Sequence, residues 1–152
     1  MCIRDRVIGD ISGVLRKVFK IVYHDTEGKS WEPTFGQQLT QQVCPRFKDQ
    51  ADLLDEGDPQ QWDVTLLCHV LLDSQWRLGR AQWESVKKLR EIRNKFFAHA
   101  SETSITKHEL HNIVDDVAKA YDDLLTENIV KKEEKDHLIS SMRAIEKGTC
   151  IL

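Results

Sequence analysis

The sequence lacks the cysteine spacing of a zinc site or of a disulfide scaffold. It has no C-x-x-C pair, and its cysteines lie far apart, at Cys2, Cys44, Cys68 and Cys150. Cys68 falls inside an apolar run and is expected to be a buried thiol, which suits a reducing, cytoplasmic compartment. The chain also lacks any apolar run near the roughly 18 residues that a membrane span needs, so we expect no membrane association.

Strand signals, internal repeats and glycine-rich phosphate loops are absent as well. Their absence excludes a β-sheet domain and a nucleotide-binding loop of the common kinds. A length of 152 residues, with 40% hydrophobic and 31% charged residues, is typical of one globular domain. The sequence therefore predicts an all-α fold.

Helical periodicity fills most of the chain. Apolar residues recur at spacings of three and four over residues 7–22, which predicts an amphipathic helix that ends near residues 26–30. A weaker helix, starting at a capping box of Thr34 and Gln37, ends before Pro45, and a short helical piece follows up to Gly57. The first third of the molecule is thus one long helix and two short ones.

Three further helices follow. The central one starts at Asp58 as N-cap and runs through an apolar stretch to about residue 74, as expected for the middle of a bundle. The next covers about residues 80–98. The last begins at a capping box of Thr106 and Glu109, and its apolar stripe reaches Leu125.

The ends of the chain differ from the middle in composition. Residues 1–6, MCIRDR, resemble a translated sequencing adapter, so we treat them as a non-native leader. Residues 7–128 are expected to form the domain. Residues 129–152 are strongly charged and are expected to form a tether or a partial helix, whose deletion leaves thermal stability nearly unchanged.

A net positive charge is also missing, because the formal net charge is −3. One segment is nevertheless basic: residues 77–99 contain seven basic and two acidic residues, which gives the segment a charge of +5. The seven are Arg77, Arg80, Lys87, Lys88, Arg90, Arg93 and Lys95. Such a stripe attracts phosphate even in an acidic protein, or it is only a solvated helix face.

The stretch RNKFFAHAS, residues 93–101, interrupts the apolar pattern of the predicted helix. On a wheel of about 100° per residue, Arg93 falls inside the stripe formed by Leu89, Phe96 and their neighbours. A charge in that position needs a carboxylate partner, such as Asp63 or Asp73, or it must face a cleft. His99 lies at the other edge of the stripe, where a lone histidine is usually a packing residue.

The combination of QQWDVTLLC, a basic linker, LREIRNKFFAHAS and a capped final helix resembles HEPN domains. The type is the one found in the DAZ-interacting RING ubiquitin ligase and beside NACHT modules in invertebrate signalling proteins. R-N-x-x-x-x-H is similar to the Rx4–6H motif of that family, and VLRKVF near the N-terminus also fits it. The resemblance covers roughly residues 7–128 and is strongest from Trp62 to Leu125.

This resemblance implies an α-helical bundle with an up-and-down core that forms a two-fold dimer within a larger signalling or innate-immunity protein. HEPN ribonucleases place both copies of the motif at the dimer cleft and cut single-stranded RNA without a metal or another cofactor. Many family members serve instead as dimerisation or recognition modules. A non-catalytic interaction module is therefore the alternative function.

The resemblance also assigns roles to the residues of the motif. Arg93 would bind the scissile phosphate, His99 would act as general acid or base, and Asn94 would hold the phosphate or the histidine. Because Arg93 and His99 are six residues apart, one straight helix separates them by about 120° and about 9 Å along its axis. Either the helix ends before His99 or a second subunit supplies the missing partner.

Four more residues complete the predicted site. Arg90, Lys95 and Lys87 would attract the RNA backbone. Asp63 would either orient Arg93 or only cap its own helix. A homodimer is also expected from Trp83 and Phe97, which form a second apolar side of the same helix.

His108, His111 and Asp115 have the spacing of a helical metal site. They lie on the polar side of the last predicted helix, and no fourth ligand is evident in the sequence. No metal is therefore expected.

Overall fold

The computed structural model describes residues 3–73, 76, 78–98 and 105–148. Within these residues the chain forms seven α-helices and no strand, which confirms the all-α fold. The α-helices are α1 (Ile3–Glu27), α2 (Gly36–Val43), α3 (Lys48–Glu56), α4 (Val64–Asp73), α5 (Arg80–Ala98), α6 (Lys107–Leu124) and α7 (Lys132–Gly148). Two 3₁₀ turns are η1 (Pro33–Phe35) and η2 (Pro59–Gln61).

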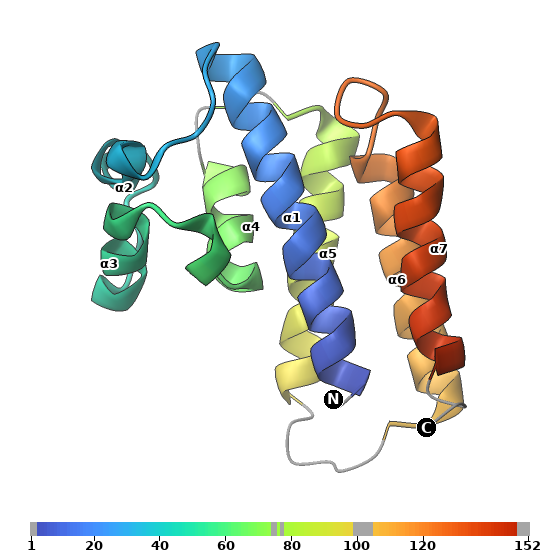
Figure 1. Cartoon of the computed structure of the whole chain (residues 1–152). Helices are drawn as coiled ribbons and strands as arrows, with labels where there is room; N and C mark the ends of the chain where they lie inside the picture. Colours follow the sequence, from blue (N-terminus) through green and yellow to red (C-terminus); the bar gives the residue numbers. More distant parts are fainter. Residues whose placement is uncertain (1–2, 74–75, 77, 99–104, 149–152) are drawn as a thin grey trace.

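Five of these helices form a bundle (Figure 1). α4, α5, α6 and α7 each pack against the next, and α1 lies against α4, α5 and α7. Gln82 at the start of α5 donates to the carbonyl oxygen of Leu124 at the end of α6, at 3.1 Å. The Lys135 Nζ near the start of α7 lies 2.8 Å from Asp122 Oδ1 near the end of α6. These contacts join opposite ends of successive helices, so α5, α6 and α7 run up and down.

α1 packs against α4, α5 and α7 and buries one apolar face among them. The apolar residues that recur every three or four positions from Val7 to Val22 are buried along it, as the periodicity predicts. The helix begins at Ile3, so residues 3–6 of the stretch treated as a leader are helical, and Ile3 packs partly against the core. A polar contact crosses to α6, where the buried Tyr121 hydroxyl donates to Asp10 Oδ1 at 2.6 Å.

α2 and α3 form a small lobe beside the bundle (Figure 1). Gly57 ends α3 with a φ of 74°, and a Cβ there would lie 2.1 Å from the carbonyl oxygen of Pro33. Only glycine fits such a left-handed position against another backbone. The lobe is joined to α4 through His69, whose Nε2 lies 3.1 Å from the carbonyl oxygen of Val43.

An aromatic cluster fills the junction between the lobe and the bundle. Ring centroids of neighbouring members lie 5.0–6.1 Å apart, mostly edge to face. The members are Phe19, Tyr23, Trp31, Phe35, Trp62 and Trp76. The indole nitrogens of Trp31 and Trp62 donate to the carbonyl oxygens of Gly57 and Leu53, so these rings are fixed by hydrogen bonds as well as by packing.

The start of α4 differs from the prediction. Asp58 accepts a hydrogen bond from the Gln60 backbone, but it caps only the short turn η2. The buried Trp62 is extended, with φ −87° and ψ 128°, and interrupts the helix because its ring fills the aromatic cluster. α4 begins after it, with the Asp63 carboxylate accepting from the Leu66 N–H at 2.9 Å.

The final predicted helix starts where its capping residues indicate. Thr106 is the N-cap of α6, and its hydroxyl accepts from the Glu109 backbone N–H at 3.1 Å. The short helix α2 ends at Val43, before Pro45, as predicted, whereas its N-cap position is Phe35 and makes no side-chain cap.

The charged segment after residue 128 contributes more to the bundle than its composition indicates. Residues 132–148 form α7, a helix of 17 residues that packs against α6 and α1. Met142 and Ile145 are buried on it, and Ile129 and Val130 are buried just before it. The expectation that this segment adds little apolar packing is wrong, because a few apolar residues at helical spacing make one continuous face among many charges.

None of the described helices has the length and apolar character that crossing a membrane requires.

Candidate nucleic-acid interface on α5

One face of α5 carries an aromatic residue, two cations and an amide. With about 100° per residue, Trp83, Lys87, Arg90 and Asn94 fall within about 60° of arc along some 17 Å of helix. We call these four residues the α5 stripe. Trp83 is 37% exposed, Asn94 is exposed, and Lys87 and Arg90 are half-buried. The opposite side of α5 faces the core through Leu89, Ile92 and Phe96 and their neighbours.

Trp83 and Lys87 contact each other at the start of the stripe. The Lys87 Nζ lies over the Trp83 ring, 4.7 Å from its centroid. A cation held on an indole face at the surface keeps both groups in a defined position. This end of the stripe therefore offers an aromatic ring and a positive charge together.

Arg93 lies at the boundary between the stripe and the core. It is half-buried, about 60° around the helix from Arg90, on the side of the buried Val86. Its Nη1 donates to the Oδ1 of the neighbouring Asn94 at 3.3 Å. The structure thus joins the first two residues of the R-N-x-x-x-x-H motif and turns the guanidinium toward the surface beside the stripe.

Asp63 lies at the beginning of α4 and works as a helix cap. Its side chain is exposed, and its Oδ1 accepts from the Leu66 N–H. Capping is one of the two roles that the sequence left open for it.

The pKa of the buried Cys68 thiol is affected by charges around the contact between α4 and α5. Its Sγ lies 3.7 Å from the carbonyl oxygen of Val86, and burial raises the pKa of this thiol to about 12. Arg90 and Arg93 lower that pKa in part, whereas Asp63 raises it. All three charges therefore lie close to one place on this side of the bundle, and the thiol itself is inert because it stays protonated.

The cations of the stripe differ in their surroundings from Lys119, Lys135 and Arg143 on α6 and α7, which pair with carboxylates. Within the described part of the chain, neither Lys87 nor Arg90 forms a salt bridge. Glu84 and Glu91 lie along one edge of the stripe, at about 40° to 60° from Lys87. Lys95 is exposed but lies about 100° from Asn94, beyond Glu91, so the structure does not bring it to the stripe.

Two residues of the sequence-based site are not covered in full. His99, the histidine of the motif, lies outside the described residues, so its position relative to Arg93 is not given. The backbone of Phe97 is helical in α5, while its side chain lies outside the description.

The histidines of α6 serve surface contacts. The His111 Nδ1 lies 2.9 Å from Glu146 Oε1 of α7, and His108 Nε2 lies 3.3 Å from the Asn112 amide. Asp115 contacts Lys119 and Arg143, at 2.9 Å and 3.3 Å. Among the residues that the structure describes, no group of three or more metal-ligating side chains is assembled.

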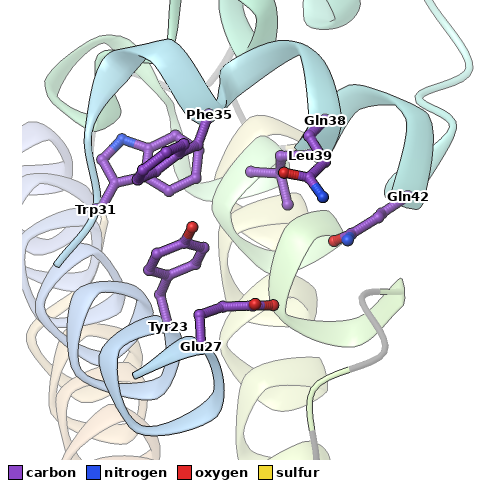
Figure 2. Close-up of a pocket in the computed structure, with 7 residues that line it drawn as sticks. All are labelled: Tyr23, Glu27, Trp31, Phe35, Gln38, Leu39 and Gln42. Atoms are coloured by element: carbon purple, nitrogen blue, oxygen red, sulfur yellow. The ribbon is translucent and has the colours of Figure 1, made fainter. Parts of the chain in front are cut away.

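A pocket between α1 and α2 was not found by reasoning from the sequence (Figure 2). Its lining includes Tyr23, Trp31 and Phe35, together with Glu27 and two glutamines. No fixed spacing in the sequence marks these aromatic residues as a set. It becomes visible only when the loop after α1 folds back.

Comparisons with family models, with curated proteins and with solved structures return no match for this chain.

Proposed function

We propose that the α5 stripe binds single-stranded RNA. The observation that supports this function is the stripe itself, where an exposed indole, two cations without a salt bridge in the described chain and an amide follow one helix face. The proposal keeps the expectation of a helical, HEPN-like module in a larger signalling or innate-immunity protein. All four residues of the α5 stripe lie within the described part of the chain.

Each group of the stripe matches one component of a nucleotide chain. Arginine and lysine neutralise backbone phosphates and release counterions, which makes binding depend on salt. An exposed indole stacks on a base, a contact worth about 1–3 kcal/mol per base. The Asn94 amide donates and accepts hydrogen bonds at the end of the stripe.

Fluorescence anisotropy with a labelled oligouridine of about twelve nucleotides tests the binding. We expect the affinity to fall steeply with added salt, and Trp83→Ala to weaken it by roughly ten-fold. Phe47→Ala is the matched control, because Phe47 is also an exposed aromatic residue, at 62%, but lies at the start of α3. Equal affinity of the wild type and the Trp83 variant would remove the stripe as the binding site.

Metal-independent RNA cleavage is the second candidate function, supported by the contact between Arg93 and Asn94 in the motif. Cleavage of the same oligonucleotide in EDTA should be lost in Arg93→Ala and in His99→Ala, while both variants keep the helical circular-dichroism signal. Asn112→Ala, an exposed amide on α6, is the control for an unrelated surface change. RNA that is bound but left intact by the wild type would reduce the function to binding.

The non-catalytic dimerisation module is the alternative, and the exposed Trp83 is the observation that favours it. A C2 interface built on α5 would cover this ring with its copy in the partner. Light scattering at micromolar protein should then give twice the monomer mass for the wild type and a monomer for Trp83→Ala. A dimer that blocks the oligonucleotide would support this module over the RNA-binding surface.

A further inference from the structure

The pocket between the end of α1 and α2 has a wall made of three aromatic rings (Figure 2). The centroids of Tyr23 and Trp31 lie 5.0 Å apart at 86°, and those of Tyr23 and Phe35 lie 6.1 Å apart at 23°. The pocket holds about 220 Å³ of empty space, part of it open to solvent. The part that a water-sized group can enter is about 10 Å³, which is enough for the head of one small polar group and too small for a nucleotide.

Aromatic faces attract cations, and this wall already holds one on its outer part. The Lys29 Nζ lies 4.2 Å from the centroid of the Phe35 ring, and Lys29 is not part of the pocket lining. The negative quadrupole of such a ring favours a positive group within about 6 Å of its centre. The chemistry of the wall therefore favours a cation in the pocket over an anion.

The remaining lining supplies acceptors for hydrogen bonds. Figure 2 shows the Glu27 carboxylate and the amides of Gln38 and Gln42 around the same opening. Gln38 and Gln42 are one turn apart on α2 and so share a face. Within the described part of the chain, these three side chains make no hydrogen bond or salt bridge, and their acceptors are available to a ligand.

Two carboxylates act on the Tyr23 phenol, while the one ammonium group described above, that of Lys29, lies on Phe35. Glu27 is the last residue of α1, where the helix dipole leaves partial negative charge. Burial raises the pKa of the Tyr23 phenol, and the carboxylates of Glu27 and Glu32 raise it further. The field at the aromatic wall thus disfavours a second anion.

We propose that this pocket binds the ammonium group of a lysine side chain from a partner polypeptide. An ammonium has three N–H donors, which match the Glu27 carboxylate and the oxygens of the two glutamine amides. The methylene stem of lysine packs on the rings and on Leu39. Glu27, Gln38 and Gln42 are exposed, and a quaternary ammonium has no N–H donor for them, so only the primary amine adds these hydrogen bonds to the contact with the rings.

The proposal does not depend on RNA binding, and nuclear magnetic resonance on the full chain tests it alone. Titration with n-butylammonium should shift the Gln38 and Gln42 side-chain amides and the Trp31 indole in a saturable way. Neutral n-butanol should give no saturable shift, and tetramethylammonium should bind at least about three-fold more weakly. A lysine capped at both backbone ends should behave like n-butylammonium, and its Nε-acetylated form should not bind.

Glu27→Gln should weaken n-butylammonium binding by at least about five-fold. Asp25→Asn is the matched control, because it removes the same charge from the same exposed end of α1 without changing the lining, and it should change binding less than about two-fold. Tighter binding of tetramethylammonium or n-propylguanidinium would overturn the lysine assignment. Equal binding of n-butanol, or equal loss in both variants, would overturn the proposal as a whole.

Discussion

Two charged surfaces of the same bundle are organised in opposite ways. Between α6 and α7, cations and carboxylates pair with each other: Arg143 lies 3.3 Å from Asp115, and Lys135 lies 2.8 Å from Asp122. On α5, Lys87 rests on an indole ring and Arg90 has no salt bridge in the described chain. One surface neutralises its own charge, and the other keeps its charge available.

The proposed RNA-binding surface therefore differs from the α6–α7 surface in how its cations are paired. Paired cations must give up a carboxylate before they can neutralise a phosphate, which offsets a small part of the gain in free energy. Cations on a helix face with an exposed tryptophan have no such cost. The comparison would break if α7 were not part of the bundle or if the two surfaces bound RNA equally.

Met142→Ala should have the largest effect, because it tests whether α7 is held by the core. Met142 is fully buried, and a buried methionine cut back to alanine costs about 2–5 kcal/mol of unfolding free energy. Urea unfolding followed by circular dichroism measures it, with the exposed Ser140→Ala as the control on the same helix. An unchanged midpoint would show that α7 is a loose tether after all.

Charge reversal should separate the two surfaces. Lys87→Glu combined with Arg90→Glu should weaken oligouridine binding by at least about thirty-fold at about 100 mM salt. Lys119→Glu combined with Arg143→Glu changes the net charge equally on the α6–α7 surface, and should weaken binding less than about three-fold. Similar losses in both double variants, measured by anisotropy, would mean that only net charge matters.

Local signals in the sequence predicted the helices well and their packing less well. Thr106 caps α6 as expected, since capping depends on a few neighbouring residues. The predicted start of α4 was too early because Trp62 is extended and not helical. Its ring packs in the aromatic cluster, whose other members come from distant parts of the chain. The apolar face of α7 was underrated because charges surround it in sequence but not in space.

For the candidate site, Lys87, Arg90 and Lys95 were predicted together from the resemblance, and not from their positions around the helix. Arg90 and Lys87 fall together with Asn94 as helical spacing requires, and Lys95 does not. The half-burial of Arg93 depends on how α4 lies against α5. No local pattern contains that information.

Asp10 is a different kind of carboxylate from those that pair with cations between α6 and α7. It is half-buried, and its partner is the neutral hydroxyl of Tyr121. Burial raises the pKa of Asp10, and the hydrogen bond from Tyr121 lowers it by less. Because the carboxylate is half-buried, solvent screens part of its charge. Asp10→Asn keeps an acceptor for that hydroxyl and removes the charge, and the melting temperature should rise by at most about 2 °C near neutral pH. Differential scanning calorimetry measures the shift.

The pH dependence of that shift has a definite sign. A carboxyl whose pKa is raised in the folded state takes up its proton on folding, so stability falls as pH rises from the unfolded pKa of 3.8 to the folded value. The gain from Asp10→Asn should therefore disappear below that window. Asp10→Ala, which leaves the buried Tyr121 hydroxyl without its acceptor, should instead lower the melting temperature.

Asp115→Asn should have the smallest effect, although Asp115 contacts two cations on the α6–α7 surface. The hydrogen bond from Lys119 holds the pKa of Asp115 below its usual value. Burial opposes it, and the hydrogen bond from Arg143 lowers the pKa further. A depressed pKa adds stability above the unfolded pKa of 3.8, and that stability is lost as pH falls through the folded value. Because water and salt screen an exposed pair, the variant should melt less than about 2 °C lower near neutral pH and no lower in acid. A larger loss that persists in acid would mean that Asp115 holds α6 and α7 together by packing, and the α6–α7 surface could not then be described as charges that only neutralise one another.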